Sequence, residues 1–195
     1  MEQAIKNPNI KLYPIDKILQ VTLLKIIPNF LTPNHFTVLR LLLTPIIILF
    51  ILKEKIILSL ILFLLAALTD AIDGAMARTR NQITEWGKIY DPIADKLLIG
   101  ATAFLLISKY LNLYFALFII LIEILLVANG ARRKSNGNII EANIWGKIKM
   151  IIQTFGIALI FLFMIFNIHF LIIASWAILI IACFFSIISL FTYSL

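Results

Sequence analysis

Long apolar runs separated by short polar stretches fill most of the chain and predict a bundle of membrane-spanning helices. Each run is long enough, or nearly so, to cross a hydrocarbon core of about 30 Å as a helix. The expected spans are residues 36–52, 55–73, 88–108, 111–131, 145–167 and 169–192. The sequence has no internal repeat and no stretch typical of a soluble domain. We therefore expect an all-α integral membrane protein with one six-helix domain over residues 36–195.

The N-terminal segment, residues 1–35, has a different pattern. Within it, residues 14–27 space apolar side chains at helical intervals around charged residues such as Asp16 and Lys25. This pattern predicts an amphipathic helix that lies in the membrane interface and ends at Pro28. An ordinary helix packed on the bundle is the alternative.

Composition and charge support a membrane protein and orient it. The chain is 62% hydrophobic, whereas soluble domains are about 45–50% apolar. Its formal net charge is +7, and the expected outer loops hold only Lys53, Lys55 and Lys109 among the basic residues between the spans. Because basic residues concentrate in cytoplasmic segments, we expect the N-terminus and the polar stretch after the second span to face the cytoplasm. Nothing in the pattern indicates nucleic-acid binding.

Four aspartates interrupt the apolar pattern between residues 69 and 100. Asp70 and Asp73 are three residues apart, and Asp91 and Asp95 are four apart. On a helix either spacing puts the pair on one face, one turn apart. The first pair ends the second span and the second pair begins the third, so the four acids are expected at one membrane face.

Small residues leave these acidic faces bare. Gly74 and Ala77 each lie one turn after an aspartate of the first pair, and Gly87 lies one turn before Asp91. Two such faces would form a pocket if they met. Four carboxylates at close range repel one another, so either they bind protons or a cation lies among them. Oxygen ligands with room for water suit Mg²⁺ or Mn²⁺, and two ions could share the cluster.

The complete motif, D-x2-D-G-x2-A-R-x8-G-x3-D-x3-D from Asp70 to Asp95, resembles the signature of the CDP-alcohol phosphatidyltransferases in all eight fixed positions. The resemblance implies a membrane enzyme that moves a phosphatidyl group from CDP-diacylglycerol to an alcohol and releases CMP. It also implies that Asp70, Asp73 and Asp91 are metal ligands. Asp95 would be both a ligand and the general base.

The resemblance extends to the nucleotide contacts. It implies that Gly74, Arg78 and Thr84 hold the CDP group. The stretch LTPNHFTVLR, residues 31–40, is similar to an entry segment of the family that lies near the same group. The residues implied there are Asn34, His35, Phe36 and Thr37. From its position, Asn34 or Thr37 is also expected to cap the first span.

The acceptor is indicated by a second polar region. Residues 139–153 resemble the Gly-Lys-x-Lys region of bacterial phosphatidylglycerophosphate and cardiolipin synthases, which implies that Lys147 and Lys149 face an acceptor phosphate. Those enzymes usually carry arginines where Ile122 and Gly130 stand here. The residues that could substitute for them are Arg132 and Arg133. Glu123, inside a span, is either a functional residue or a buried acid bonded to a neighbouring helix.

Glycerol 3-phosphate is the leading acceptor, while phosphatidylglycerol, inositol phosphate and serine stay open. A cation-coupled transporter is the alternative from another class, but it would place its acids near the midplane and often show repeated halves. A non-catalytic scaffold would leave the four acids unexplained. The family resemblance also implies a homodimer.

Overall fold

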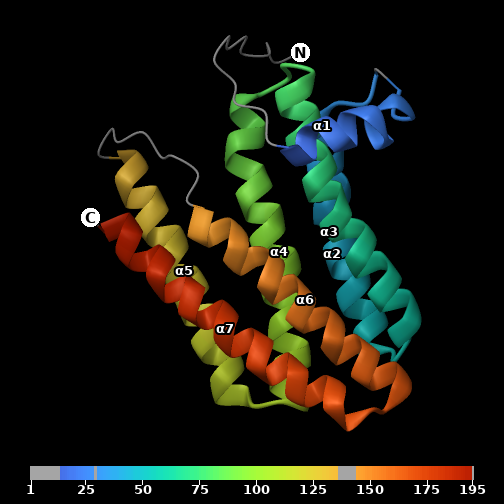
Figure 1. The fold of residues 1–195 in the computed structure, drawn as a ribbon, viewed down its shortest axis with the longest axis vertical. Helices are drawn as coiled ribbons and strands as arrows, with labels where there is room; N and C mark the ends of the chain where they lie inside the picture. Colours follow the sequence, from blue (N-terminus) through green and yellow to red (C-terminus); the bar gives the residue numbers. More distant parts are fainter. Residues whose placement is uncertain (1–13, 29, 136–143, 195) are drawn as a thin grey trace. The chain divides into compact units, whose positions relative to one another are not determined.

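The described part of the chain, in a computed structural model, is residues 14–28, 30–135 and 144–194, and it consists of helices joined by short turns, without a strand (Figure 1). The elements are α1 (Pro14–Val21), the 3₁₀ turn η1 (Leu23–Lys25), α2 (Pro33–Leu52), α3 (Ile56–Thr79), α4 (Glu85–Tyr110), α5 (Leu113–Ser135), α6 (Ile144–Phe166) and α7 (His169–Ser194). The all-α prediction is confirmed, and each long helix agrees with a predicted span to within a few residues at most ends.

Among the described residues, five helices are long and apolar enough to cross a membrane: α2, α3, α5, α6 and α7. Large apolar side chains such as Leu49, Leu65, Ile151 and Phe184 remain exposed along them, as expected for surfaces that face lipid. The remaining long helix, α4, carries charged residues through its first half. The chain is thus a multi-pass membrane protein, and the count of six spans stays a prediction.

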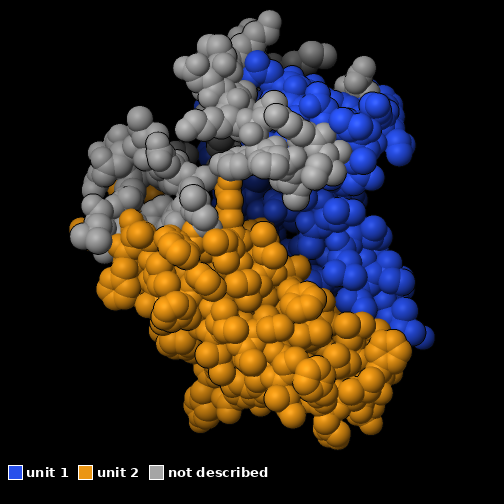
Figure 2. All heavy atoms as spheres, in the orientation of Figure 1, with its two compact units in different colours: residues 1–98 blue, residues 99–195 orange. Residues whose placement is uncertain are grey.

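The chain divides into two compact units, residues 1–98 and 99–195 (Figure 2). In the first unit α2 packs against α3, and side chains such as Ile47 and Phe63 are fully buried. The first part of α4 belongs to this unit, so all four aspartates of the motif lie within it.

The N-terminal helix packs on the end of α3. Leu19 of α1 and Leu24 of η1 are buried in one cluster with Ile72, Ala75 and Met76 of α3. The apolar face of α1 therefore contacts protein, as the packed alternative predicted. The helix is also shorter than the predicted 14–27, because the backbone leaves helical geometry at Thr22 and continues as a 3₁₀ turn.

The first long helix begins earlier than predicted, and a different residue caps it. α2 starts at Pro33, with Thr32 as its N-cap. The backbone N–H of Thr32 donates to Nδ1 of His35 at 3.0 Å. Proline suits the first helical position because the missing N–H would have no helical partner there. Asn34 and Thr37 therefore lie inside the helix, and the expectation that one of them is the cap is wrong.

In the second unit α7 packs against both α6 and α5 (Figure 1). Gly156 permits a close approach of α6 and α7, since a Cβ there would lie 2.9 Å from the Leu179 side chain. The Ser175 hydroxyl donates to the Gly156 carbonyl at 2.9 Å. Phe115 of α5 stacks on Trp176 of α7, with ring centroids 4.9 Å apart. Small residues and side-chain hydrogen bonds of this kind hold helices together in lipid.

Candidate active site

The four aspartates come from adjoining parts of α3 and α4 in the first unit. Asp70 and Asp73 lie one turn apart near the end of α3, and Asp91 and Asp95 lie one turn apart near the start of α4. Their side chains differ in exposure: 35% for Asp70, 15% for Asp95 and 4% for Asp73. The cluster is therefore accessible at Asp70 and closed at Asp73.

Arg40 of α2 joins the aspartates of both helices. Its guanidinium donates to Asp70 Oδ1 at 3.2 Å and also forms ion pairs with Asp73 and Asp95. The Arg40 side chain is fully buried. One guanidinium thus brings three of the four motif aspartates, from two different helices, to a common point.

Asp91 is held by a separate set of polar side chains. Thr37, one turn before Arg40 on α2, donates its hydroxyl to Asp91. Nearby, the Thr84 hydroxyl donates to Asn34 Oδ1 and accepts from the Gly87 N–H, both at 2.9 Å. A Cβ at Gly87 would lie 3.1–3.3 Å from side-chain oxygens of Thr84, Asn34 and Asp91. A side chain there would crowd this network, which agrees with the expectation that glycine leaves the face bare.

Arg78, expected at the CDP group, is bound by an acid of the N-terminal helix. Its Nε and Nη2 donate to the two carboxylate oxygens of Asp16 at 2.8 and 2.7 Å. Asp16 is fully buried, whereas the Arg78 side chain is 28% exposed. A Cβ at Gly74 would lie 3.3 Å from the Arg78 guanidinium, so the bare face at Gly74 gives this arginine room.

The other two residues expected near the CDP group have local roles. His35 accepts the N–H of Thr32 at the start of α2. Phe36 is partly buried against the cluster that joins α1, η1 and α3. The entry segment therefore supplies Asn34 and Thr37 to the polar network, while His35 and Phe36 shape the helix start and its packing.

The donor set of the cluster suits Mg²⁺ or Mn²⁺, because hard divalent ions prefer carboxylate oxygens. Three of the carboxylates already contact one cationic group, the guanidinium of Arg40. In this arrangement, no three Asp, Glu, His or Cys side chains of the described residues are placed to ligate a single ion. The carboxylate oxygens of the cluster suit a metal ion, and in this structure three of the carboxylates are arranged around the Arg40 guanidinium.

The basic residues expected at the acceptor belong to the second unit. Lys149 is buried and forms an ion pair with Glu123, which joins α6 to α5. Lys147 is exposed, because residues two apart on a helix do not share a face. Arg132 is exposed near the end of α5, and the side chain of Arg133 lies outside the described residues. The structure thus brings Lys149 together with Glu123, the buried acid of the neighbouring helix.

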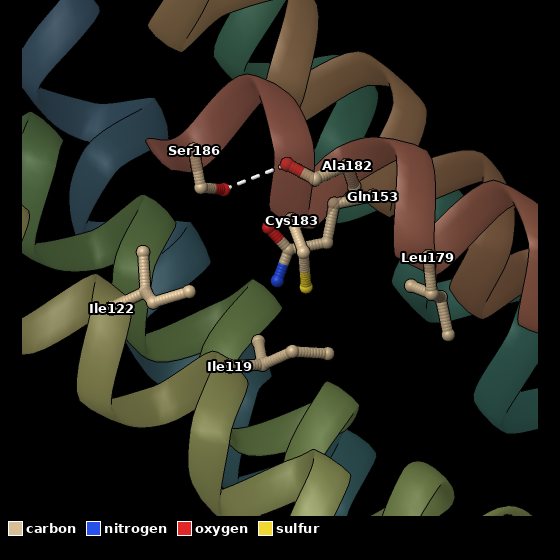
Figure 3. A pocket seen from close by; sticks show the side chains of 7 residues that line it. All are labelled: Ile119, Ile122, Gln153, Leu179, Ala182, Cys183 and Ser186. Carbon is tan, nitrogen blue, oxygen red and sulfur yellow. Dashed lines mark hydrogen bonds between the residues drawn. The ribbon is translucent and has the colours of Figure 1, made fainter. Parts of the chain in front are cut away.

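A small cavity lies beside this ion pair. Its lining residues are Ile119, Ile122, Gln153, Leu179, Ala182, Cys183 and Ser186. Figure 3 shows the Gln153 amide between side chains of α5 and α7. The cavity leaves the centre of a water molecule about 10 Å³ in which to lie. This is room for at most one water. The cavity is too small for a phosphorylated alcohol, so it is not an acceptor site.

The sequence analysis missed two residues of the site, Arg40 and Asp16. Arg40 ended the entry segment but was given no role, although a charged residue inside a membrane helix marks a candidate functional site. Asp16 was treated only as part of a polar helix face. In each case the residue type was visible in the sequence, and its partner was not.

Comparison with known proteins agrees with the motif. A sequence model described as CDP-alcohol phosphatidyltransferase matches residues 30–188. A Bacillus subtilis protein named CDP-diacylglycerol–glycerol-3-phosphate 3-phosphatidyltransferase is 33% identical over 139 residues, 68% of this chain and 69% of that protein.

Two relatives with the same name are more similar over shorter stretches. The one from Rickettsia typhi is 44% identical over 82 residues, 40% of this chain and 45% of the relative. The one from Aquifex aeolicus is 49% identical over 65 residues, 33% of this chain and 36% of the relative. The chain thus matches less than half the length of these two proteins.

Proposed function

Because the chain belongs to the CDP-alcohol phosphatidyltransferase family, we propose that it moves a phosphatidyl group from CDP-diacylglycerol to an alcohol and releases CMP. The observation that carries this proposal is the gathering of the motif aspartates around the buried guanidinium of Arg40. We propose sn-glycerol 3-phosphate as the acceptor, which gives phosphatidylglycerol phosphate. The names of the relatives support this choice.

The residues divide into two roles. Asp70, Asp73, Asp91 and Asp95 would hold two divalent ions, Mg²⁺ or Mn²⁺, which supply charge neutralisation at the diphosphate. The CDP group is held by Gly74, Arg78 and Thr84, with Asn34 and Thr37 in the adjoining network. Arg78 supports this role because part of its side chain is exposed while Asp16 fixes the orientation of its guanidinium.

The transfer itself needs a base and a leaving group. Asp95 takes the proton from the acceptor hydroxyl, whose oxygen forms a bond to the lipid-side phosphorus. The bond from that phosphorus to the bridging oxygen breaks, and this oxygen leaves as part of CMP. The Arg78 guanidinium stabilises the charge on the departing phosphate.

The membrane setting of the protein is part of the proposal. We propose that the protein lies in the cell's inner membrane as a homodimer, with its N-terminus and the aspartates on the cytoplasmic side. The uneven distribution of lysine and arginine supports that orientation. Among the expected acceptor contacts, Lys147 and Arg132 remain candidates because they are exposed, whereas Lys149 is bound to Glu123.

The test is an acceptor panel with the purified full chain and labelled CDP-diacylglycerol. CMP release and the lipid product are measured with glycerol 3-phosphate, phosphatidylglycerol, inositol phosphate and serine, with Mg²⁺ or with excess chelator. We expect phosphatidylglycerol phosphate in Mg²⁺ and no turnover in chelator. A product from another acceptor would reassign the substrate, and undiminished turnover in chelator would refute the metal role. Absence of CMP release with every acceptor would contradict the enzyme itself.

A further inference from the structure

Arg40 is a buried cation in an otherwise apolar stretch of α2. Its side chain has no exposed surface, and an arginine in that position is strongly destabilising unless it is paired and hydrogen-bonded. Its partners are Asp70 and Asp73 of α3 and Asp95 of α4. The guanidinium therefore links three helices through carboxylates that the motif also assigns to metal binding.

When ionised, the four carboxylates of the cluster carry more charge than the Arg40 guanidinium can offset. One guanidinium carries a single positive charge, so it cannot neutralise the four carboxylates of Asp70, Asp73, Asp91 and Asp95. The surplus negative charge favours binding of further cations. A carboxylate oxygen that accepts a hydrogen bond from Arg40 is at the same time less available to a metal ion. The guanidinium and a divalent ion would thus bind the same carboxylate oxygens.

We propose that Arg40 is the resident counter-cation of the aspartate cluster, and that divalent metal binds there in competition with the Arg40 ion pairs. The inference rests on the proposed metal role of the aspartates. In metal-free protein Arg40 keeps the carboxylates together and limits their repulsion. When metal binds, the guanidinium gives up at least part of its contacts, so Arg40 acts as a positioning residue and not as a ligand.

The test is Mn²⁺ binding to the purified full chain after metal has been removed, measured by electron paramagnetic resonance of free Mn²⁺ and by thermal unfolding. For Arg40→Gln we expect the Mn²⁺ dissociation constant to fall roughly ten- to a hundredfold, the equivalent of one charge-assisted hydrogen bond. In chelator the same variant should unfold at a lower temperature than the wild type. Adding Mn²⁺ should then raise its unfolding temperature by more than it raises that of the wild type.

Two further variants give the comparison its controls. Arg80→Gln removes an arginine of the same unit that donates to the Leu24 and Ile27 carbonyls at 2.9 and 2.8 Å. It should lower the unfolding temperature equally with and without Mn²⁺ and leave the dissociation constant unchanged. Arg40→Lys keeps the charge but loses the planar fork. It serves where Arg40→Gln does not fold, and its Mn²⁺ affinity should lie above that of the wild type.

The outcomes separate this inference from the proposed function. If the wild type binds Mn²⁺ but Arg40→Gln binds it equally or more weakly, Arg40 does not compete and the inference is wrong, while the enzyme proposal stands. If the wild type binds no Mn²⁺, the metal role of the aspartates fails first. A lower Mn²⁺ dissociation constant for Arg40→Gln, with a larger Mn²⁺-induced rise in its unfolding temperature than in that of the wild type, supports the competition.

Discussion

Each unit of the molecule buries charged side chains, but the two units balance them differently. In the first unit the Arg40 guanidinium faces a cluster of four aspartates. In the second unit a single lysine, Lys149, pairs with a single glutamate, Glu123. The first arrangement has surplus negative charge and favours additional cations. The second is neutral and needs none.

The charged side chains of the two units also differ in exposure to solvent. Asp70 keeps 35% of its side chain exposed, which gives a ligand access to the cluster. Glu123 and Lys149 are each about nine-tenths buried, at 11% and 10%, and the adjacent cavity has room for about one water. The accessible cluster is the one proposed to serve chemistry, whereas the closed Lys149–Glu123 pair joins α6 to α5.

The largest effect is expected from Asp95→Asn, which tests the functional side of this comparison. Asparagine keeps the shape of the side chain and can offer one oxygen to a metal, but it cannot accept the proton of the acceptor hydroxyl. We expect kcat to fall about 10²- to 10⁴-fold, the usual contribution of a general base. Binding of CDP-diacylglycerol, measured by thermal shift, should stay close to wild type.

Glu85→Gln is the matched control, because it makes the same acid-to-amide change at the start of the same helix, outside the cluster. It should leave kcat within a few-fold of wild type. Substantial turnover by Asp95→Asn would mean that the base is another residue. Complete loss of donor binding would instead make Asp95 chiefly a metal ligand.

Breaking the Lys149–Glu123 ion pair should lower the free energy of unfolding without changing catalysis. Lys149→Met leaves Glu123 buried without its partner, and such changes typically cost about 3–5 kcal/mol of unfolding free energy. Replacing both residues, as Lys149→Met with Glu123→Leu, should recover most of that loss, since apolar pairs often replace buried ion pairs without cost. Unfolding in detergent measures both effects.

The exposed neighbour Lys147 is the control for that experiment. Lys147→Met should change the unfolding free energy by no more than about 0.5 kcal/mol, as is usual at exposed positions.

The variant that carries both Lys149→Met and Glu123→Leu also decides whether Lys149 has a second role, at the acceptor. An unchanged KM for glycerol 3-phosphate is expected from a structural pair, and a KM raised more than tenfold would return Lys149 to the acceptor site.

Sequence reasoning succeeded where the information was periodic or local. Apolar runs of sufficient length predicted the helices α2 to α7 to within a few residues at most ends, because crossing a membrane leaves the backbone few alternatives to a helix. The spacing of Asp70, Asp73, Asp91 and Asp95 predicted two acidic faces, and α3 and α4 do carry them.

What the sequence did not reveal were the partners. Arg40 is 30 residues from Asp70 in sequence, and Asp16 is 62 from Arg78, so only the tertiary fold brings each pair together. Lys149 was expected at a phosphate because of its local motif, but the helix turns it inward to Glu123. The start of α2 was misplaced for a local reason: Thr32 precedes a proline that begins the helix well.

The smallest effect that we predict concerns the Asp16–Arg78 ion pair of the first unit, and it asks whether a buried ion pair outside the cluster is always structural. Asp16 pairs with Arg78 as Glu123 does with Lys149, but the Arg78 side chain is 28% exposed, and Arg78 is proposed to hold the nucleotide. Asp16→Asn keeps one acceptor oxygen and loses the charge that orients the guanidinium. We expect KM for CDP-diacylglycerol to rise roughly tenfold, which corresponds to the loss of about one hydrogen bond to a charged group, while kcat changes much less.

The control is Arg80→Gln, which removes an arginine bonded to η1 backbone carbonyls. It should lower the unfolding temperature without raising KM. If Asp16→Asn behaves in the same way as Arg80→Gln, the Asp16–Arg78 pair only anchors α1, and balanced pairs are structural in both units.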